Sequence, residues 1–286
     1  MRSAATRQGR LVALSVPILN EAAAMGRSIV LARVLGADEL GRAMLLALSL
    51  RLVEMASDVA AERLLVVARD GDDATLQANM HGAVFLRGLF MSVFLLLLAW
   101  PMAVGFDGGP VWTSYAILAG VPLLRGLMHL DYRRLERHFS YRRLAFVDGG
   151  GAILMFVVTI PLAFWWGDHR AMVGILLAQV GAQVVISHLV AERQYQLRFD
   201  RAVLLRVWAF GAPLIVNSLL MFVTFQADRM TVAGFFTWAD VAAYSVALQL
   251  AMLPAQILGR AAGSVLAPRL RLAHEAGTLS QVVRRM

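Results

Sequence analysis

The sequence contains neither cysteine nor lysine, and its six histidines are scattered along the chain. Without cysteine the protein can form no disulfide bond and no thiolate metal site, and no pair of histidines has the spacing of metal ligands. The glycines at 149–151 lack the Lys-Ser/Thr pair of a phosphate-binding loop. No nucleophile and base occur in a recognisable constellation. We therefore expect no metal, no cofactor and no enzymatic activity.

Charged residues are also scarce, at 16%, whereas hydrophobic residues make up 59% of the chain. An ordinary soluble domain is about 45–50% apolar, so the surplus predicts a membrane protein. The net charge is +8, and all 27 basic residues are arginine. A basic protein can bind nucleic acid. These arginines, however, lie between apolar runs and form no continuous patch, so we expect no nucleic-acid partner.

Eight segments approach the roughly 20 apolar residues that a membrane-spanning helix needs. Five of them are free of charge: Gly88–Gly105, Gly149–Gly167, Ala171–Val190, Val207–Ala227 and Val241–Gly259. Val111–Leu130 is apolar except for Arg125 and His129. Leu11–Leu35 and Ala43–Ala68 carry several charges, so we expect both to face a polar interior. Polar residues behind the basic N-terminus argue against a cleavable signal peptide.

The arginines outside these segments are distributed unequally. If the N-terminus is inside, most of them fall in the inside segments 1–10, 68–80, 131–143, 192–206 and 269–286, whereas the outside loops hold only Arg42 and Arg170. Basic residues favour the cytoplasmic side, and omitting the second span would reverse every later loop. The sequence therefore predicts an all-α, polytopic transmembrane helix bundle of about eight spans with both termini inside.

The first two and the last two predicted spans resemble each other. Pro17 and Pro213 each lie early in a span, and Arg33 and Arg229 follow them at the same separation. Each copy then continues into a short loop that contains Ala-Asp. Both copies start inside, so the repeat is parallel. Transporters are commonly built from such repeats and bind substrate between them near the membrane midplane.

At these residues the chain resembles a known family. The stretch ARVLGADELGRAMLLALSL (32–50) is similar to the first helix hairpin of polysaccharide and O-antigen flippases. The stretch FGAPLIVNSLLMFVTFQADRMTVAGFFTWADVAAYSVALQLAMLPAQILG (210–259) is similar to the start of their second lobe. These flippases belong to the multidrug/oligosaccharidyl-lipid/polysaccharide exporter superfamily. The resemblance implies a six-helix first lobe over residues 1–200 and a partial second lobe over residues 201–286.

The resemblance also implies a function. It implies that an undecaprenyl-pyrophosphate-linked oligosaccharide is moved across the bacterial inner membrane by alternating access, through a cavity lined mainly by the first, second, seventh and eighth spans. The expected partners are this substrate, membrane lipids, and a polysaccharide polymerase or another protein of the pathway. Such flippases have more spans than this chain, so we expect the chain to be truncated after the eighth helix.

Polar residues inside the predicted spans are the candidates for the substrate cavity, because charges at bilayer depth are costly and face the interior of a bundle. The candidates are Asn20, Glu21, Arg27, Arg51, Glu54, Asp58, Asn217, Gln226, Gln249, Gln256 and Arg260. Arg33, Asp228 and Arg229 are expected near the extracellular mouth, where snorkelling explains the two arginines. Arg27 is a candidate for phosphate contact.

Structural explanations remain open for several of these residues. Arg51 and Glu54 can pair within one helix, and Arg27 can pair with an acidic residue of the second span. The amides can hold helices together, and we expect Arg125 and His129 to pair with Asp148.

Three functions remain open. They are the flippase, a small-molecule or drug exporter of the same superfamily, and a membrane-embedded polymerase or ligase of the sugar pathway. A truncated, non-transporting fragment is a further alternative. The cavity arginines argue against export of organic cations, and the short outside loops argue against an enzyme.

Overall fold

A computed structural model describes residues 2–106, 111–138 and 140–255, and in this part of the chain all regular secondary structure is helical, without strands. The elements are α1 (Arg2–Val34), α2 (Ala37–Ala56), α3 (Ala61–Val67), α4 (Ala74–Phe106), α5 (Val111–Leu118), α6 (Gly120–Gly126), α7 (Asp131–Arg137), α8 (Arg142–Leu144), the π-helical turn η1 (Ala145–Gly149), α9 (Gly150–Trp166), α10 (Arg170–Leu189) and α11 (Arg201–Phe235). A further helix covers residues 238–255. The predicted all-α class is confirmed.

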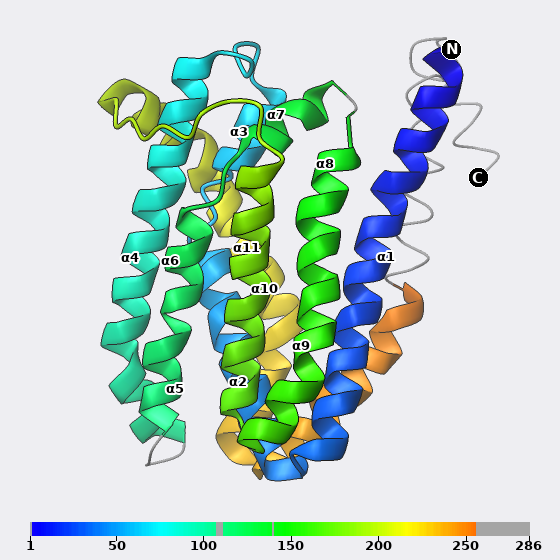
Figure 1. Cartoon of the computed structure of the whole chain (residues 1–286). Coiled ribbons are helices and arrows are strands. Elements are labelled where there is room, and N and C mark those ends of the chain that lie inside the picture. The colour runs from blue at the N-terminus through cyan, green and yellow to red at the C-terminus, as the bar shows by residue number, and fades with distance from the viewer. Residues whose placement is uncertain (1, 107–110, 139, 256–286) are drawn as a thin grey trace, which may run out of the picture.

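The long helices lie side by side as one bundle, with α3 and α7 at the upper end and the connection between α9 and α10 at the lower end (Figure 1). By length and composition, four described helical stretches could cross a membrane: Ala74–Pro101, Arg142–Trp166, Arg170–Leu189 and Arg201–Phe235. Their outward faces carry large apolar side chains such as Leu97 and Phe164, which suits contact with lipid. The count of eight spans and the orientation remain predictions.

The predicted second span, Ala43–Ala68, is not one helix. The helix α2 ends at Ala56 and α3 begins at Ala61, with Ala60 in the left-handed conformation at a φ of 52°. Short polar side chains stabilise this break by bonding to the nearby backbone. The Ser57 hydroxyl donates to the Val53 carbonyl over 2.9 Å, and the Asp58 carboxylate accepts from the Ala60 amide over 3.0 Å. The chain therefore interrupts the helix where the sequence pattern predicted continuity.

Two neighbouring helices secure the break. The last carbonyls of a helix have no partner within it, and Arg87 of α4 donates to the Glu54 carbonyl (2.8 Å) and to the Ser57 hydroxyl (3.1 Å). On another side, Gly211 of α11 lies directly against the Val59 backbone, where a Cβ would overlap the Val59 carbonyl. The absence of a side chain at Gly211 lets α11 approach the broken segment.

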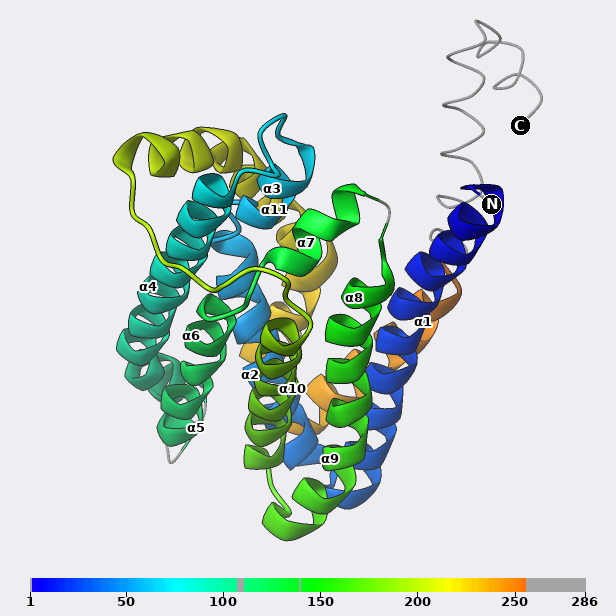
Figure 2. The ribbon, with the colours of Figure 1, turned by 45° about the horizontal axis from the view of Figure 1, so that its top comes forward.

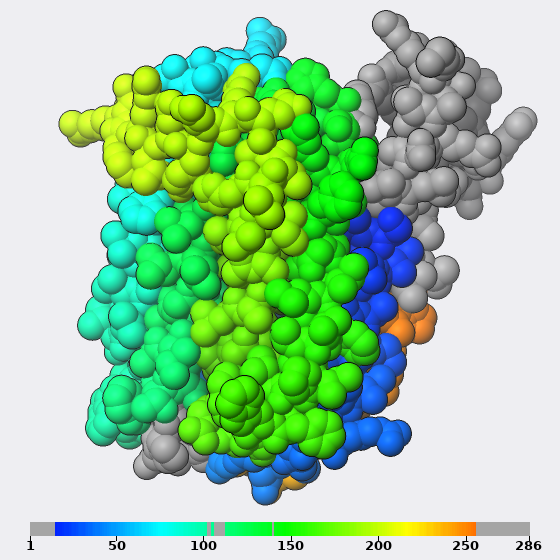
Figure 3. Space-filling view, viewed as in Figure 1, coloured from blue at the N-terminus to red at the C-terminus, as the bar shows by residue number. Residues whose placement is uncertain are grey.

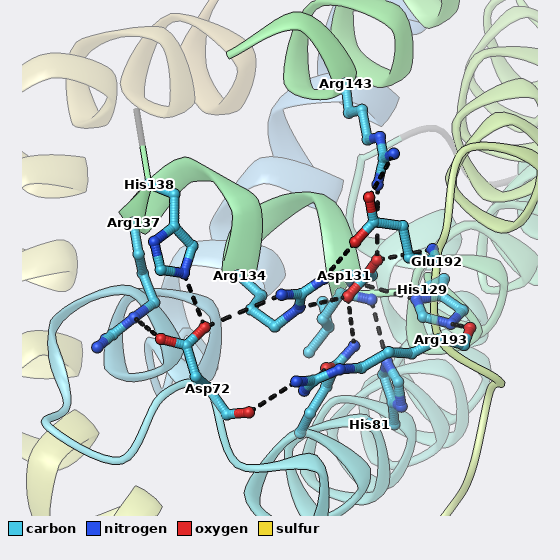
Figure 4. A network of polar contacts seen from close by, with 12 residues as sticks. Asp72, His81, His129, Asp131, Arg134, Arg137, His138, Arg143, Glu192 and Arg193 are labelled. Carbon is cyan, nitrogen blue, oxygen red and sulfur yellow. Dashed lines mark hydrogen bonds and ion pairs between the residues drawn. The ribbon is translucent and has the colours of Figure 1, made fainter. Parts of the chain in front are cut away.

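A buried polar network fixes the segment that joins α10 to α11 (Figure 4). At its centre is Asp131, whose side chain is fully buried. Its carboxylate accepts from Arg134 Nε over 2.7 Å, from the Glu192 amide over 2.8 Å and from Gln77 Nε2 over 3.3 Å. Arg134 also binds the Glu192 carboxylate over 2.9 Å. One carboxylate thus ties α4 and α7 to the start of the joining segment.

Two histidines extend this attachment further along the segment. His81 contacts the Gln196 carbonyl through Nδ1 (3.1 Å) and accepts from the Leu130 amide at Nε2 (3.0 Å). His129 contacts the Arg193 carbonyl through Nε2 (3.0 Å) and accepts from the Asp131 amide at Nδ1 (3.1 Å). Each imidazole accepts a hydrogen bond from a backbone amide at one ring nitrogen, so it is neutral and donates through its other nitrogen. The joining segment is therefore a fixed part of the bundle.

A second cluster holds the opposite end together. Glu39, near the start of α2, accepts from His169 Nδ1 over 2.7 Å and from the His169 amide over 2.9 Å. Arg42 pairs with Glu39 and its guanidinium stacks over the Trp238 ring at 5.9 Å. These contacts connect α2, the turn before α10 and the helix of residues 238–255.

Replacing Gly211 with alanine tests the contact with the broken segment. The new methyl group would overlap the Val59 backbone, so we expect G211A to lower the free energy of unfolding by about 1–3 kcal/mol. Thermal unfolding in detergent measures the change. The matched control is Gly181→Ala in α10, where an added Cβ meets nothing within 4 Å; an equal loss in both variants would contradict the proposed contact.

Replacing Asp131 with asparagine tests the buried network. Burial raises the pKa of the Asp131 carboxyl, but hydrogen bonds from Arg134, Glu192 and Gln77 outweigh burial and hold that pKa below its usual value of 3.8. The charged carboxylate therefore stabilises the fold above about pH 4, and this stabilisation is lost as the pH falls through the lowered pKa. At pH 7 we expect D131N to cost about 1.5–3 kcal/mol.

Thermal unfolding from pH 3 to pH 7 measures this difference, which we expect to shrink as the pH falls because the native carboxyl becomes protonated. The control is Asp70→Asn. The hydrogen bond from Arg206 holds the pKa of Asp70 at about 2, but this pair is exposed, so its loss should matter little. A D131N difference that stays constant across the pH range would contradict the assignment.

Candidate functional site

Two adjoining cavities lie inside the bundle. The first has a volume of about 610 Å³ and is bordered by residues of α2, α3, α4, α6 and α7. The second has a volume of about 720 Å³ and lies between α1, α2, α6, α10, α11 and the helix of residues 238–255. Both are lined by Arg51, Glu54, Met55 and Arg125. These shared walls make the two cavities one polar region that runs from the α3–α7 end into the bundle.

Most of the polar residues predicted for a cavity line this region. The second cavity contains Glu21, Arg27, Arg51, Glu54, Gln226 and Gln249 in its walls. Asp58 lines the first cavity. Asp228 and Arg229, expected at the extracellular mouth, line the second cavity beside Arg27. The structure thus brings together residues from both copies of the predicted repeat.

Other candidates lie elsewhere. Asn20 is half-buried, Asn217 and Arg33 are exposed, and none of the three is in the walls of either cavity. Arg33 and Arg229, which match in the repeat, therefore have different surroundings. Gln256 and Arg260 lie outside the described residues.

One ion pair crosses the region where the two cavities meet. Arg125 Nη1 of α6 lies 2.8 Å from Glu54 Oε1 of α2. The expectation that Arg125 pairs with Asp148 was wrong, because Glu54 is the carboxylate within reach. His129 does not pair with Asp148 either and contacts the Arg193 carbonyl. Glu54 therefore bridges α2 to α6, instead of pairing with Arg51 along its own helix.

Three arginines of the second cavity have no carboxylate partner among the described residues: Arg27, Arg51 and Arg229. The closest polar contact of Arg27 is with the Met155 sulfur, at 3.4 Å from Nη1, and a thioether is a weak acceptor. The Nε atoms of Arg27 and Arg229 are buried without a hydrogen-bond partner in the described part of the chain. Arg229 is attracted by the neighbouring Asp228 carboxylate, with which it forms no ion pair, and is repelled by Arg51. A buried donor without a partner is costly, so these guanidiniums indicate a place for an anion.

The carboxylates of the second cavity are already engaged. Glu54 faces Arg125, and Glu21 also has an interaction partner. Asp228 accepts from the Tyr244 hydroxyl over 2.6 Å and from the Arg229 amide over 2.8 Å. The walls of this cavity carry four arginines and three carboxylates, so the net charge of its lining is positive.

Several wall residues were not predicted from the sequence. They are Arg63, Arg87, Arg125, Arg133, Glu136 and Gln179, whereas Glu62 was expected on the inward polar face of the second span and also lines the first cavity. Arg133 lies in a loop segment that the charge distribution placed at the surface, yet it binds Glu62 over 2.9 Å. Arg87 stands just before an apolar run and resembles a boundary residue. Arg125 carried the one usable signal, as a charge within an otherwise apolar span.

A hydrogen bond joins the two copies of the repeat across the second cavity. Ser28 of α1 donates to the Gln249 amide oxygen over 3.0 Å. Gln249 belongs to the helix of residues 238–255, and Gln226 of α11 lines the same space. The helices of the repeat therefore border this cavity, together with parts of α6 and α10.

Comparison with known proteins assigns the family. A family model described as "Polysaccharide biosynthesis protein" matches residues 30–286. The chain belongs to this family. The chain is also 24% identical over 260 residues to the succinoglycan biosynthesis transport protein ExoT of Rhizobium meliloti (strain 1021), and the match covers 89% of this chain and 51% of the relative. It thus spans about half the length of that relative. None of the solved structures matches it.

The family match confirms the resemblance stated from the sequence. Together with the apolar helices, it indicates that this chain is a multi-pass membrane protein. The name of the relative describes a transport protein rather than an enzyme. The division into lobes at residue 200 remains a prediction.

A double-mutant cycle tests which arginine pairs with Glu54. We expect E54Q and R125Q to be coupled by about 0.5–3 kcal/mol in the free energy of unfolding, as residues in contact usually are. The comparison cycle of E54Q with R51Q should give a coupling near zero. Thermal unfolding of the single and double variants measures both terms, and a larger coupling for Arg51 would contradict the observed pairing.

Proposed function

We propose that this protein translocates a lipid-linked oligosaccharide across the membrane by alternating access. The observation that carries the proposal is the group of guanidiniums in the second cavity, Arg27, Arg51 and Arg229, which lack carboxylate partners among the described residues. The family match and the transport protein among its relatives support the same class of function.

The chemistry of the cavity favours an anionic group with several oxygen atoms. A guanidinium presents five donors in a planar fork and binds phosphate oxygens with two parallel hydrogen bonds. A pyrophosphate between a lipid and a sugar offers such oxygens on one molecule, so several arginines can share it. Gln226 and Gln249 in the same walls supply amides suited to sugar hydroxyls. No covalent step is needed for this reaction.

The asymmetry of the bundle supports alternating access. The first cavity is bordered by α3 and α7 at the upper end of the bundle in Figure 1. At the lower end, Glu39, His169 and Arg42 hold three elements together. Movement of the bundle to the alternative state would then open the Glu39 cluster and close the α3–α7 end. The direction of transport is set by the difference in the free energy of the substrate between the two sides of the membrane.

Export of organic cations is the competing function, and the charges of the second cavity disfavour it. Cation binding needs free carboxylates, whereas Glu54 and Asp228 are engaged by Arg125, Tyr244 and the Arg229 amide. The arginines of the same cavity would repel a cationic drug.

Binding of undecaprenyl pyrophosphate to the purified chain tests the anion site. We expect R27Q, R51Q and R229Q each to weaken binding about tenfold or more, because a hydrogen bond to a charged group contributes about 1.5–3 kcal/mol. Native mass spectrometry of titrated protein measures the affinity, with undecaprenol as the uncharged comparison. The matched control is Arg33→Gln, which removes an exposed arginine from the same helix as Arg27. Equal binding of undecaprenol and the pyrophosphate would overturn the site.

Complementation of a flippase-null strain tests transport itself and belongs to the same prediction. We expect the native chain to restore surface polysaccharide, R33Q to do so as well, and the three cavity variants to restore less at equal protein level in the membrane. Lack of restoration by the native chain, once it is shown to be inserted, would refute transport by this chain alone.

A further inference from the structure

The segment that joins α10 to α11 carries an unusual combination of exposed side chains. We define the linker surface as Leu197, Arg198, Phe199, Arg201, Leu205 and Trp208. Its apolar members are strongly exposed, with Phe199 at 51%, Leu205 at 57% and Trp208 at 58%. Large apolar side chains exposed in a group mark an interaction site. Figure 3 shows this part of the chain, in yellow-green, projecting at the upper left of the molecule.

From Arg201 onward, the linker surface is one face of α11, and the other face of these turns packs against the bundle. Arg201, Leu205 and Trp208 follow the helical spacing of four and then three residues, so they point the same way. The other face of the first turns of α11 carries Val207, which is buried with Leu65 and Met80. The core of this bundle is therefore already filled by the other face of α11, and the exposed apolar residues do not belong to it.

The backbone beneath this surface is held rigidly. The Arg198 amide donates to the Ala78 carbonyl over 3.1 Å, and the Asp200 amide donates to Asn79 Oδ1 over 2.7 Å. The Asp200 carboxylate caps α11 by accepting from the amides of Ala202 (2.8 Å) and Val203 (3.2 Å). Figure 2 shows the first turns of α11 lying across the bundle near the start of α4. The backbone that carries the exposed side chains is thus fixed to the bundle by hydrogen bonds.

The charge on this surface is positive and uncompensated. Arg198 and Arg201 are exposed and make no ion pair with any described residue. Arg206, on the opposite side of the same helix, differs because it binds Asp70 through two hydrogen bonds of 2.6 and 2.8 Å. Asp200 is occupied as the helix cap. Two free guanidiniums therefore stand beside Phe199 and Trp208.

We propose that the linker surface binds anionic phospholipid head groups at the surface of the membrane. Tryptophan and phenylalanine rings lie at the boundary between hydrocarbon and head groups, and arginine side chains reach from there to phosphate oxygens. Each basic residue near an anionic lipid surface contributes about 1 kcal/mol. The combination of apolar anchors and unpaired arginines at the start of α11 and in the segment just before it matches the composition of interfacial helices. A water-exposed loop would leave these rings in water without compensation.

This binding would attach the connection between the two halves of the predicted repeat to one leaflet. The joining segment is already fixed to α4 and α7 through Asp131, His81 and His129. The lipid contact would hold the start of α11 at a constant depth while the rest of α11 borders the second cavity. The proposal concerns the surface alone and does not depend on transport.

Lipid titration of the purified full chain tests the proposal. The probe is phosphatidylglycerol, with phosphatidylcholine as the uncharged comparison, and native mass spectrometry gives the affinity of each variant. We expect R201Q to weaken phosphatidylglycerol binding about fivefold and R198Q/R201Q about 25-fold, from about 1 kcal/mol for each arginine. The matched control is R206Q, which removes the same charge from the same helix but from the side occupied by Asp70; it should stay within about twofold of native.

Equal losses in R201Q and R206Q would show an effect of net charge only and overturn the proposal, as would unchanged binding in the double variant. Undecaprenyl pyrophosphate binding should survive R198Q/R201Q, so a failure of the lipid site and a failure of the cavity site give different results.

Fluorescence quenching gives a second readout. The difference between the native chain and W208F in vesicles isolates the signal of Trp208. A spin label on the lipid head group should quench that signal more strongly than a label deep in the acyl chain. A Trp208 signal that neither label quenches would refute lipid contact and show that the surface faces water. A chain that elutes as a dimer with Trp208 shielded would also refute it and show that the surface binds a second copy of the chain.

Discussion

The interruption of the second predicted span at residues 57–60 is the constraint on which the polar interior depends. An unbroken helix would carry Asp58 and Glu62 along one face and would satisfy its own carbonyl groups. At the break the Glu54 carbonyl accepts from Ser57 of the same segment and from Arg87 of α4. The turn also puts Asp58 beside Arg63 and Arg87, within 4.0 Å. The first cavity forms where the backbone changes direction, so its charged walls are a direct result of the break.

Glycine at position 211 lets α11 pack closely against the break at residues 57–60. A side chain there would push α11 away from Val59, and the second cavity lies between α11 and α2. The separation of these helices therefore depends on a contact at backbone level. The pair of Glu54 and Arg125 then fixes α6 against α2 at the junction of the two cavities. The spacing of α11 and α2 and the pairing of Glu54 with Arg125 therefore shape the same small region, where the polar groups gather.

Much of this interior could be predicted from the sequence, because charges inside apolar runs have few tolerable positions. Glu21, Arg27, Arg51 and Glu54 were predicted to face a cavity, and they line one. The helix break could not be predicted, since Ser57 and Asp58 terminate the helix through local hydrogen bonds that compete weakly in most contexts. Ala60 in a left-handed conformation gives no sequence signal, because that conformation is expected of glycine.

Pairing between residues that are distant in the sequence could not be predicted either. The sequence offered Asp148 as a partner for Arg125, whereas the packing of α6 on α2 supplies Glu54. Asn20 was predicted because it shares a helix face with Arg27, and Asn217 because of its residue type, but neither lies in the walls of the cavities. Rotation about a helix axis is set by the neighbouring helices, and a single sequence holds little information on it.

The buried carboxylate of Asp131 has a consequence for the order of biosynthesis. Arg134 and Gln77 lie within α7 and α4, so they can bind this carboxylate as soon as those two helices have been made. The third donor, the Glu192 amide, lies 61 residues after Asp131 in the chain. The hydrogen bonds around Asp131 are therefore complete only after the ribosome has supplied the segment that leads into α11.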